Sequence, residues 1–171
     1  PVIEVCNLKK YFEIKTGFFQ SLMAKHVPLV HAVDGVTFQI MPREVFGLVG
    51  ESGCGKTTTG KVLIRLLEPT DGKVIFDGVD IATLPDKEMG KLRKKIQMIF
   101  QDPYESLNPR MSTYDIIAEP IEIQKIAESP EEVLGLVSKA LEELGLIPPE
   151  EFLFRFPHEL SGGQRQRVAV A

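Results

Sequence analysis

A glycine-rich loop that closes on lysine and threonine constrains this chain more than any other feature. Residues 50–58 read GESGCGKTT and complete the spacing G-x-x-x-x-G-K-T. The apolar run VFGLV at residues 45–49 precedes the loop, and apolar residues at helical spacing follow it. The pattern predicts a buried strand of a parallel sheet, then a tight turn, then an amphipathic helix that runs from Lys56 to Leu67.

The glycines of this loop indicate a site for phosphate groups. They let the backbone curl so that successive N–H groups point to the mouth of a helix, where the macrodipole also favours negative charge. Lys56 adds a positive charge for the terminal phosphates, and the Thr57 hydroxyl can reach a Mg²⁺ ion that bridges them. An ordinary glycine-rich turn is disfavoured by the strand and helix on either side. The predicted binding residues are Gly50, Glu51, Ser52, Gly53, Cys54, Gly55, Lys56, Thr57 and Thr58, of which Glu51 and Cys54 contribute mainly backbone groups.

Composition narrows the class of protein. With 43% hydrophobic and 26% charged residues, the 171-residue chain has the composition of one soluble domain. The net charge of −4 argues against broad nucleic-acid binding. The chain has no apolar run of about 18 residues and no secretory leader pattern, so we expect a cytoplasmic location. Two cysteines and three histidines without ligand spacing predict neither a disulfide nor a zinc site.

Strand patterns before and after the loop predict an accessory antiparallel sheet. Residues 2–8 and 30–40 read as strands, with Asp34-Gly35 as a turn or bulge inside the second. Residues 73–76 and the Asp77-Gly78 turn predict a hairpin. All of these elements belong to one sheet in this prediction.

Two further residues are candidates for ligand contact. Tyr11 follows the first predicted strand and could stack on a base, although local sequence alone favours a core position. Gln101 follows a predicted strand at residues 96–100, where a neutral amide could coordinate a metal or orient water. A basic helix at residues 85–95 precedes that strand, and its charges read as a solvated face.

The residue pattern changes after Gln101. Prolines recur along the chain, and the spacing of apolar residues predicts an amphipathic helix at residues 131–144 with Gly145 as its C-terminal cap. We read this region as a helical subdomain inserted between sheet strands. The sequence LSGGQ at residues 160–164 then predicts a second anion-binding helix mouth, with Ser161 as its N-cap.

Together these motifs resemble the ATP-binding cassette (ABC) ATPases, and the resemblance covers essentially the whole chain. It makes Tyr11 the adenine-stacking aromatic, residues 50–58 the Walker A loop, Gln101 the Q-loop glutamine and residues 160–164 the family signature. The sequence FQDPYESLNPR at residues 100–110 is similar to that of oligopeptide and dipeptide importers, a group that also includes nickel importers. One departure is Arg43, where the family usually has glycine in a surface turn.

The resemblance implies an α/β fold, a P-loop NTPase core with an antiparallel β accessory sheet and an inserted helical subdomain. The implied divisions are residues 1–101 for the nucleotide-binding core, 102–160 for the helical subdomain and 161–171 for the signature helix. The implied cofactors are ATP and Mg²⁺, with Lys56 and Gln101 as catalytic residues and with Thr57 and Gln101 as metal ligands. The implied nucleotide-binding residues of the signature are Ser161, Gly162, Gly163 and Gln164. Of these, Ser161 and Gly163 reach the γ-phosphate held by an opposite subunit.

The implied partners are a second ABC ATPase subunit in a head-to-tail dimer, membrane permease subunits and an extracytoplasmic substrate-binding protein. A groove around residues 101–110 would receive a helix of the permease, and the protein would lie on the inner face of the membrane. No nucleic acid is expected. The alternative function is a soluble ABC ATPase that acts on nucleic acid or ribosomes, which the acidic composition disfavours.

One part of the family pattern is missing. The chain contains no apolar run that closes on Asp-Glu, which is the Walker B feature, and no switch histidine after it. We therefore expect a chain truncated at its C-terminus, the N-terminal part of one ABC ATPase domain, that binds nucleotide without hydrolysing it.

Overall fold

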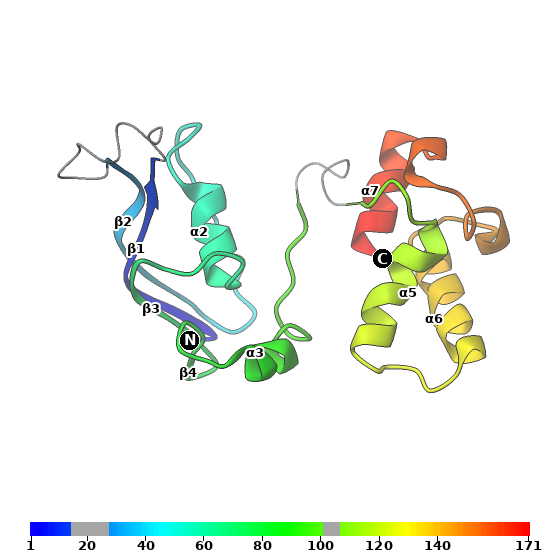
Figure 1. Ribbon diagram of the computed structural model, residues 1–171, viewed down its shortest axis with the longest axis horizontal. Helices are drawn as coiled ribbons and strands as arrows, with labels where there is room; N and C mark the ends of the chain where they lie inside the picture. Colours follow the sequence, from blue (N-terminus) through cyan, green and yellow to red (C-terminus); the bar gives the residue numbers. More distant parts are fainter. Residues whose placement is uncertain (15–27, 101–106) are drawn as a thin grey trace, which may run out of the picture. The chain divides into compact units, whose positions relative to one another are not determined.

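The computed structural model describes residues 1–14, 28–100 and 107–171. These residues form two compact units, Pro1–Gln97 and Met98–Ala171 (Figure 1). Each unit has its own hydrophobic core. The predicted Q-loop residue Gln101 lies outside the described residues. The predicted boundary of the nucleotide-binding core at residue 101 stays a prediction.

The first unit is built on a four-stranded antiparallel sheet with the strand order β2-β1-β3-β4 (Figure 1). Its strands are β1 (Ile3–Glu13), β2 (Leu29–Ile40), β3 (Asp71–Phe76) and β4 (Val79–Asp80). The turn between β3 and β4 has positive φ angles at Asp77 and Gly78, 51° and 80°, as expected of an Asp-Gly hairpin turn. The predicted accessory sheet is thus confirmed, with β1 five residues longer at its C-terminal end than the prediction, which ended at residue 8.

The pairing of β1 with β2 is irregular in its central part. Leu8 lies opposite Val36, and Lys10 lies opposite Val33. Over this interval β2 therefore contains one residue more than β1. The extra length contains the predicted turn or bulge at Asp34-Gly35, where Gly35 has a φ of +73°. The sequence signal therefore marks a bulge inside the strand.

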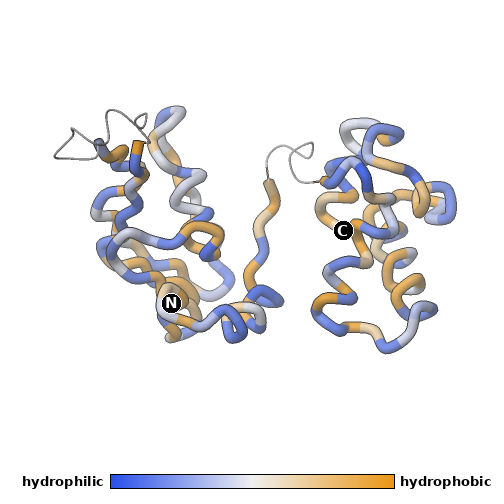
Figure 2. Tube along the Cα trace, viewed as in Figure 1, coloured by the Kyte–Doolittle hydropathy of each residue, from blue (hydrophilic) through white to orange (hydrophobic). Residues whose placement is uncertain are grey.

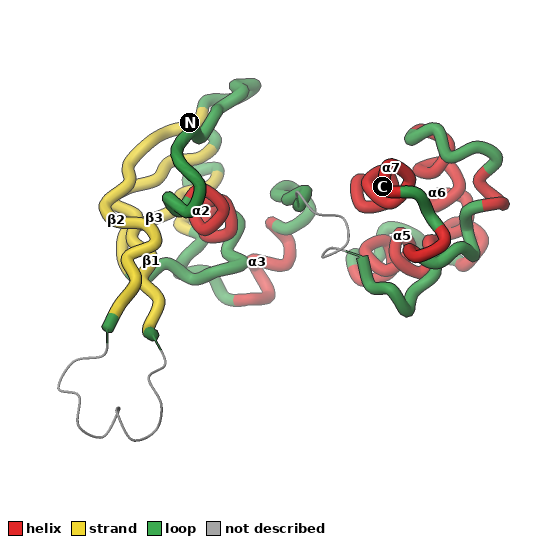
Figure 3. The backbone as a smooth tube through the Cα atoms, turned by 90° about the horizontal axis from the view of Figure 1, so that it is seen from above, coloured by secondary structure: helices red, strands yellow, loops and turns green. Residues whose placement is uncertain are grey.

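Two helices accompany this sheet, α2 (Lys56–Leu63) and α3 (Asp86–Leu92), and Figures 1 and 3 both show α2 beside it. The core that joins sheet and helices is formed by buried apolar side chains of Val5, Leu8, Val33, Val62, Val74, Phe76, Ile81 and Met89. Val62 of α2 is 1% exposed, so the helix packs on the sheet through this residue. The predicted helix to Leu67 is too long, because the chain turns at Arg65, whose φ is +52°.

Two predicted strands are wrong for this structure, the parallel-sheet strand at residues 45–49 and the strand at residues 96–100. Residues 45–49 and 96–100 form no strand among the described residues, and Val45 and Val49 are 99% and 93% exposed. Apolar composition alone does not make a strand, because the backbone N–H and C=O groups need a neighbouring strand to pair with. Among the described residues, no strand pairs with either segment. Figure 2 shows that the segment before residue 101 is mostly apolar in colour, with a hydrophilic interruption.

The second unit is helical, as predicted for the region after Gln101. It contains α5 (Thr113–Ile123), α6 (Pro130–Glu143) and α7 (Gly162–Val170), with short 3₁₀ turns η1 (Pro149–Glu151) and η2 (Pro157–Glu159). The amphipathic reading of α6 is confirmed, since its buried residues are Val133, Val137 and Leu141. Gly145 follows α6 with a φ of +69°, the left-handed conformation of a C-terminal cap.

Candidate nucleotide-binding site

The predicted phosphate loop ends at the N-terminus of α2, in the geometry that an anion site requires. Gly55 is the N-cap residue with φ 94°, and the described chain gives this helix end no side-chain cap and no acidic residue in the first turn. The first N–H groups of a helix have no partner within it. A phosphate group can therefore bind these N–H groups and the positive end of the helix dipole without displacing a carboxylate of the protein.

Backbone packing and backbone conformation explain two of the glycines, Gly55 and Gly53. A Cβ atom on Gly55 would overlap the carbonyl oxygen of Ala32 in β2, and one on Gly50 would lie 2.6 Å from the Cys54 sulfur. Gly53 has a φ of +81°, which L-residues with side chains rarely adopt. The loop backbone therefore favours glycine at positions 53 and 55, whereas a Cβ at position 50 would have to displace only the Cys54 side chain.

Lys56 places its ammonium group over the same loop. Its Nζ donates hydrogen bonds to the carbonyl oxygens of Gly50 and Glu51, at 2.8 and 2.5 Å, and lies 3.6 Å from the sulfur of Cys54. The positive charge thus stands at the mouth of the loop, where phosphates would enter. Thr57 is exposed, so its hydroxyl is accessible to a ligand.

The base of this helix is held by a neighbouring threonine. Thr59 is buried, and its hydroxyl and its backbone N–H both donate to the carbonyl oxygen of Gly55, at 3.0 and 2.8 Å. Thr58 is half-buried, while Ser52 and Gly53 are exposed. The first helical turn is therefore fixed on its core side and open on its loop side.

Tyr11 lies inside β1 and not in the core, so the alternative of a core position is wrong. Its ring is half-buried and stacks on the ring of His31 in β2, with centroids 4.0 Å apart and an angle of 16° between the planes. Its hydroxyl donates a 2.6 Å hydrogen bond to Asp34. This bond raises the pKa of Tyr11 and lowers the pKa of Asp34. Sequence reasoning identified Tyr11 but missed its contacts with His31 and Asp34. The predicted turn or bulge at Asp34-Gly35 was the only sequence signal for this part of β2.

The signature turn forms the second helix mouth, in the second unit. The Ser161 hydroxyl accepts a hydrogen bond from the Gln164 N–H at 3.3 Å, and the Gln164 side chain accepts one from the Ser161 N–H at 2.9 Å. This reciprocal pair is a capping box, and it confirms Ser161 as the N-cap. Gly162 and Gly163 are exposed, and no described heavy atom lies within 4 Å of the position of a Cβ on either.

Two arginines that sequence reasoning missed hold the signature helix in its unit. Arg165 is 8% exposed and donates to the carbonyl oxygen of Pro157 at 3.0 Å. Arg167 donates to the carbonyl oxygens of Leu144 and Gly145, at 3.2 and 3.0 Å, and so binds the C-terminal end of α6. These contacts fix α7 within its unit, and the turn at Ser161 is exposed at the surface.

The structure places only part of the predicted metal site. Thr57 is described, whereas Gln101 lies outside the described residues, as does most of the predicted connection between β1 and β2. Over residues 1–14, 28–100 and 107–171, no group of three or more His, Cys, Asp or Glu side chains could hold a metal ion. Within the same ranges, no helix has both the length and the apolar composition to cross a bilayer.

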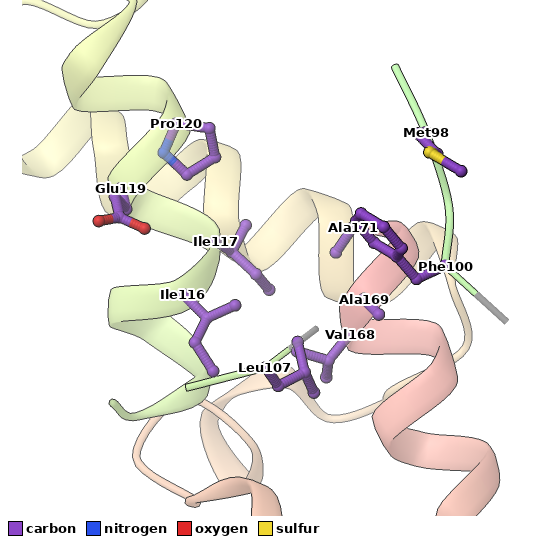
Figure 4. Close-up of a pocket in the computed structure, with 10 residues that line it drawn as sticks. All are labelled: Met98, Phe100, Leu107, Ile116, Ile117, Glu119, Pro120, Val168, Ala169 and Ala171. Carbon is purple, nitrogen blue, oxygen red and sulfur yellow. The ribbon is translucent and has the colours of Figure 1, made fainter. Parts of the chain in front are cut away.

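A groove of about 360 Å³ opens in the second unit (Figure 4). Side chains of α5, α7 and the segments beside residues 101–106 line it, and Figure 4 shows that they are mostly apolar with a single carboxylate, Glu119. Ile116 and Ile117 of α5 and Val168 of α7 are among its lining residues. Of the described residues in the predicted permease groove around residues 101–110, Leu107 lines it. The lining residues are Met98, Phe100, Leu107, Ile116, Ile117, Glu119, Pro120, Val168, Ala169 and Ala171.

Three similar proteins are described as ATP-binding proteins of oligopeptide transport or glutathione import. The chain is 49% identical over its whole length to a protein of Bacillus subtilis described as the putative oligopeptide transport ATP-binding protein YkfD, of which it covers 48%. It is 46% identical to the oligopeptide transport ATP-binding protein OppF of the same organism, with 99% of this chain and 52% of that protein covered. It is 44% identical to the glutathione import ATP-binding protein GsiA of Escherichia coli O157:H7, of which it covers 26%. The chain thus spans about half the length, or less, of these curated relatives.

Solved structures agree with the sequence relatives. A dimeric structure of the ATP-binding cassette MJ0796, described as a post-hydrolysis state bound to ADP and Pi, matches with a TM-score of 0.79 at 29% identity, over 98% of this chain and 67% of that one. A second dimeric structure of MJ0796 matches with a TM-score of 0.77 at 30% identity, again over 98% of this chain and 67% of that one. These likenesses show that the fold is that of an ABC ATPase cassette.

The family assignment rests on the sequence profile as well as on these neighbours. Residues 33–171, which include both helix mouths, match the ABC transporter family. The chain therefore belongs to the ABC transporter family of ATP-binding proteins.

Proposed function

We propose that this chain is the ATP-binding part of an ABC importer subunit, which hydrolyses ATP to drive uptake of peptides. The observation that carries the proposal is the uncapped N-terminus of α2 with Lys56 over the glycine loop. Relatives described as oligopeptide and glutathione import proteins support the peptide class of solute. They give no support to the alternative of a soluble ATPase acting on nucleic acid or ribosomes.

In this proposal the first unit binds one nucleotide. The N–H groups of residues 50–58 and the ammonium of Lys56 bind the β- and γ-phosphates, and Tyr11 stacks on the adenine. Thr57 and Gln101 hold Mg²⁺. The bound Mg²⁺-ATP supplies the γ-phosphoryl group for transfer to water, and the protein contributes mainly position and charge neutralisation.

The signature turn serves a second nucleotide, held by a neighbouring subunit. Ser161, Gly162, Gly163 and Gln164 form a helix N-terminus that has its own capping box and is exposed at Ser161 and at both glycines. The γ-phosphate would bind the N–H groups at this end across a head-to-tail interface. The structures of the similar cassette MJ0796 are described as dimeric, which supports the dimer in this proposal. Two cassettes would then enclose two nucleotides.

The groove in Figure 4 supports a permease contact. Its apolar walls fit one face of an amphipathic helix, and it flanks the segment that contains Gln101. A helix seated there would sense the γ-phosphate through Gln101. In the whole system an extracytoplasmic binding protein delivers the solute, and the ATPase lies on the cytoplasmic face of the membrane.

The test uses the protein expressed from its complete natural gene, reconstituted with its permease subunits in vesicles. We expect ATP turnover that rises when the permease is present, and uptake of labelled peptide that requires ATP. Lys56→Ala should abolish both, while Lys87→Ala, which removes one exposed lysine from α3 of the same unit, should preserve both. Turnover equal in the wild type and in Lys56→Ala would contradict the proposal, and uptake of nickel without peptide would correct the solute.

A further inference from the structure

Tyr11 is held by contacts at its backbone N–H, at its hydroxyl and on one face of its ring. Its backbone N–H donates to the hydroxyl of Thr70 at 2.9 Å on the β3 side. On the β2 side, Asp34 accepts from its phenol at 2.6 Å, and His31 stacks on one face of its ring. One aromatic side chain is therefore fixed at its backbone, at its hydroxyl and on one face.

The bulges in β2 create this arrangement. Tyr11 and His31 are direct cross-strand partners, so their side chains stand on the same face of the sheet. Asp34 is three residues further along β2, and a regular strand would place it about 10 Å from His31 and on the other face. Because β2 contains extra residues opposite Leu8–Tyr11, the Asp34 carboxylate comes within 2.6 Å of the phenol and within 3.6 Å of the His31 ring.

The same strand leads directly to the phosphate loop. Ala32 follows His31, and its carbonyl oxygen packs against Gly55 at the N-terminus of α2. Val33 is buried in the core that also contains Val62 of α2. The tyrosine ring and the phosphate-binding helix mouth are thus joined by two residues of β2.

We propose that Asp34 and His31 are positioning residues for nucleotide binding, which hold the Tyr11 ring so that its second face is presented to the base. The proposal rests on the proposed function, since it assumes that the first unit binds a nucleotide. A purine stacks on one face of an aromatic ring, and a ring already fixed loses less conformational freedom on binding. His31 covers one face, so a single base binds on the other. In this proposal Asp34 and His31 contact Tyr11 and form no hydrogen bond with the edge of the base. The site therefore binds purine nucleotides through stacking.

The experiment separates the base from the phosphates. We would measure the affinities of ATP and of inorganic tripolyphosphate by calorimetry, with the protein expressed from its complete natural gene. Asp34→Ala and His31→Ala should each weaken ATP roughly threefold to tenfold, the range that corresponds to loss of one aromatic contact. Both should leave tripolyphosphate within about twofold of the wild type. Asp86→Ala, which removes an exposed carboxylate from α3, is the matched control and should change neither.

Four further variants show whether the effect passes through Tyr11. Asp34→Asn keeps an oxygen that accepts the phenol hydrogen bond, so it should restore ATP affinity to near the wild-type value. The double variant Tyr11→Ala/Asp34→Ala should bind ATP no more weakly than Tyr11→Ala alone. Ultraviolet titration, with Tyr11→Phe to identify the signal, should show that Asp34→Ala lowers the pKa of Tyr11 toward its ordinary value.

The outcomes are distinct. If Asp34→Ala weakens tripolyphosphate as much as ATP, or still weakens ATP when Tyr11 is absent, the positioning role is overturned. If the wild type binds both ligands and the Asp34 and His31 variants bind them equally well, the inference fails while the nucleotide site stands. If the wild type binds neither ligand better than Lys56→Ala, both the inference and the proposed function fail.

Discussion

The carbonyl oxygen of Ala32 occupies the place where a Cβ atom on Gly55 would stand. This contact makes the end of the phosphate loop and the edge strand β2 parts of one packed structure. Gly55 also has a φ of +94°, so a substitution there meets both backbone strain and a clash with backbone. The loop conformation and the sheet therefore depend on each other.

Gly55→Ala should destabilise the first unit and weaken nucleotide binding. The left-handed conformation alone costs about 1–2 kcal/mol for a residue with a Cβ, and the clash adds to that. Urea denaturation should show a lower midpoint, and ATP affinity should fall with it. Gly135→Ala in α6 is the control, since Gly135 lies inside a helix and no described heavy atom lies within 4 Å of its Cβ position. That change should raise stability by about 0.5–1 kcal/mol, and an equal loss in both variants would contradict the account.

Bound nucleotide should protect Cys54 from alkylation. Cys54 is exposed in the loop with its sulfur 3.6 Å from the Lys56 ammonium, so phosphates in the loop would cover it. Cys6 is the internal control, because partial burial and Glu4 raise the pKa of its thiol and slow its reaction at neutral pH. Maleimide labelling followed by mass spectrometry should show ATP-dependent protection at Cys54 and none at Cys6. Unchanged labelling of Cys54 at saturating ATP would place the nucleotide elsewhere.

The pairing of β1 with β3 should contribute a pH-dependent part of stability through Asp71. The N–H of Gly72 and then the ammonium of Lys9 hold the pKa of this carboxyl below its ordinary value of 3.8. A carboxyl with a lowered folded-state pKa stabilises the fold above its unfolded-state pKa, and this contribution is lost as pH falls through the folded-state pKa. Asp71→Asn should therefore flatten the stability profile below about pH 4 and leave its shape near pH 7 unchanged. If the stability of the two proteins fell in the same way below about pH 4, these contacts would contribute no net stability.

Arg167 should stabilise the second unit by joining α7 to the end of α6. Its guanidinium donates to Leu144 and Gly145 and reaches the carbonyl of Gly163 at 3.4 Å. Loss of such charge-assisted bonds at an exposed site should cost about 1 kcal/mol. Arg167→Ala should lower the thermal midpoint, while Gln166→Ala, an exposed neighbour on the same helix, should change it little. Equal midpoints for the two variants would show that Arg167 does not hold the helix.

Local chemistry explains what could be predicted from the sequence. Gly55, Ser161 and Gly145 each stand where a helix end needs a particular backbone or cap, and these positions were predicted correctly. The antiparallel hairpin around Asp77-Gly78 follows from the same kind of local rule. The roles of these residues toward nucleotide stay predictions.

Long-range pairing explains what could not. The apolar residues 45–49 read as a buried strand, yet a strand needs a partner, and the described chain supplies none there. The contacts of Asp34 with Tyr11 depend on bulges in β2 whose register no short pattern specifies. Arg167 bonds to carbonyls more than twenty residues away, which periodicity does not reveal.

The central claim is that the loop at residues 50–58 holds the phosphates of a nucleotide through Lys56 and the open end of α2. The most direct measurement is the equilibrium affinity of the wild type and of Lys56→Ala for Mg²⁺-ATP, with Lys87→Ala as the charge-matched control. We predict at least a roughly tenfold loss of affinity in Lys56→Ala, equivalent to about 1.4 kcal/mol, and wild-type affinity in Lys87→Ala. Equal affinities in all three proteins would contradict the account.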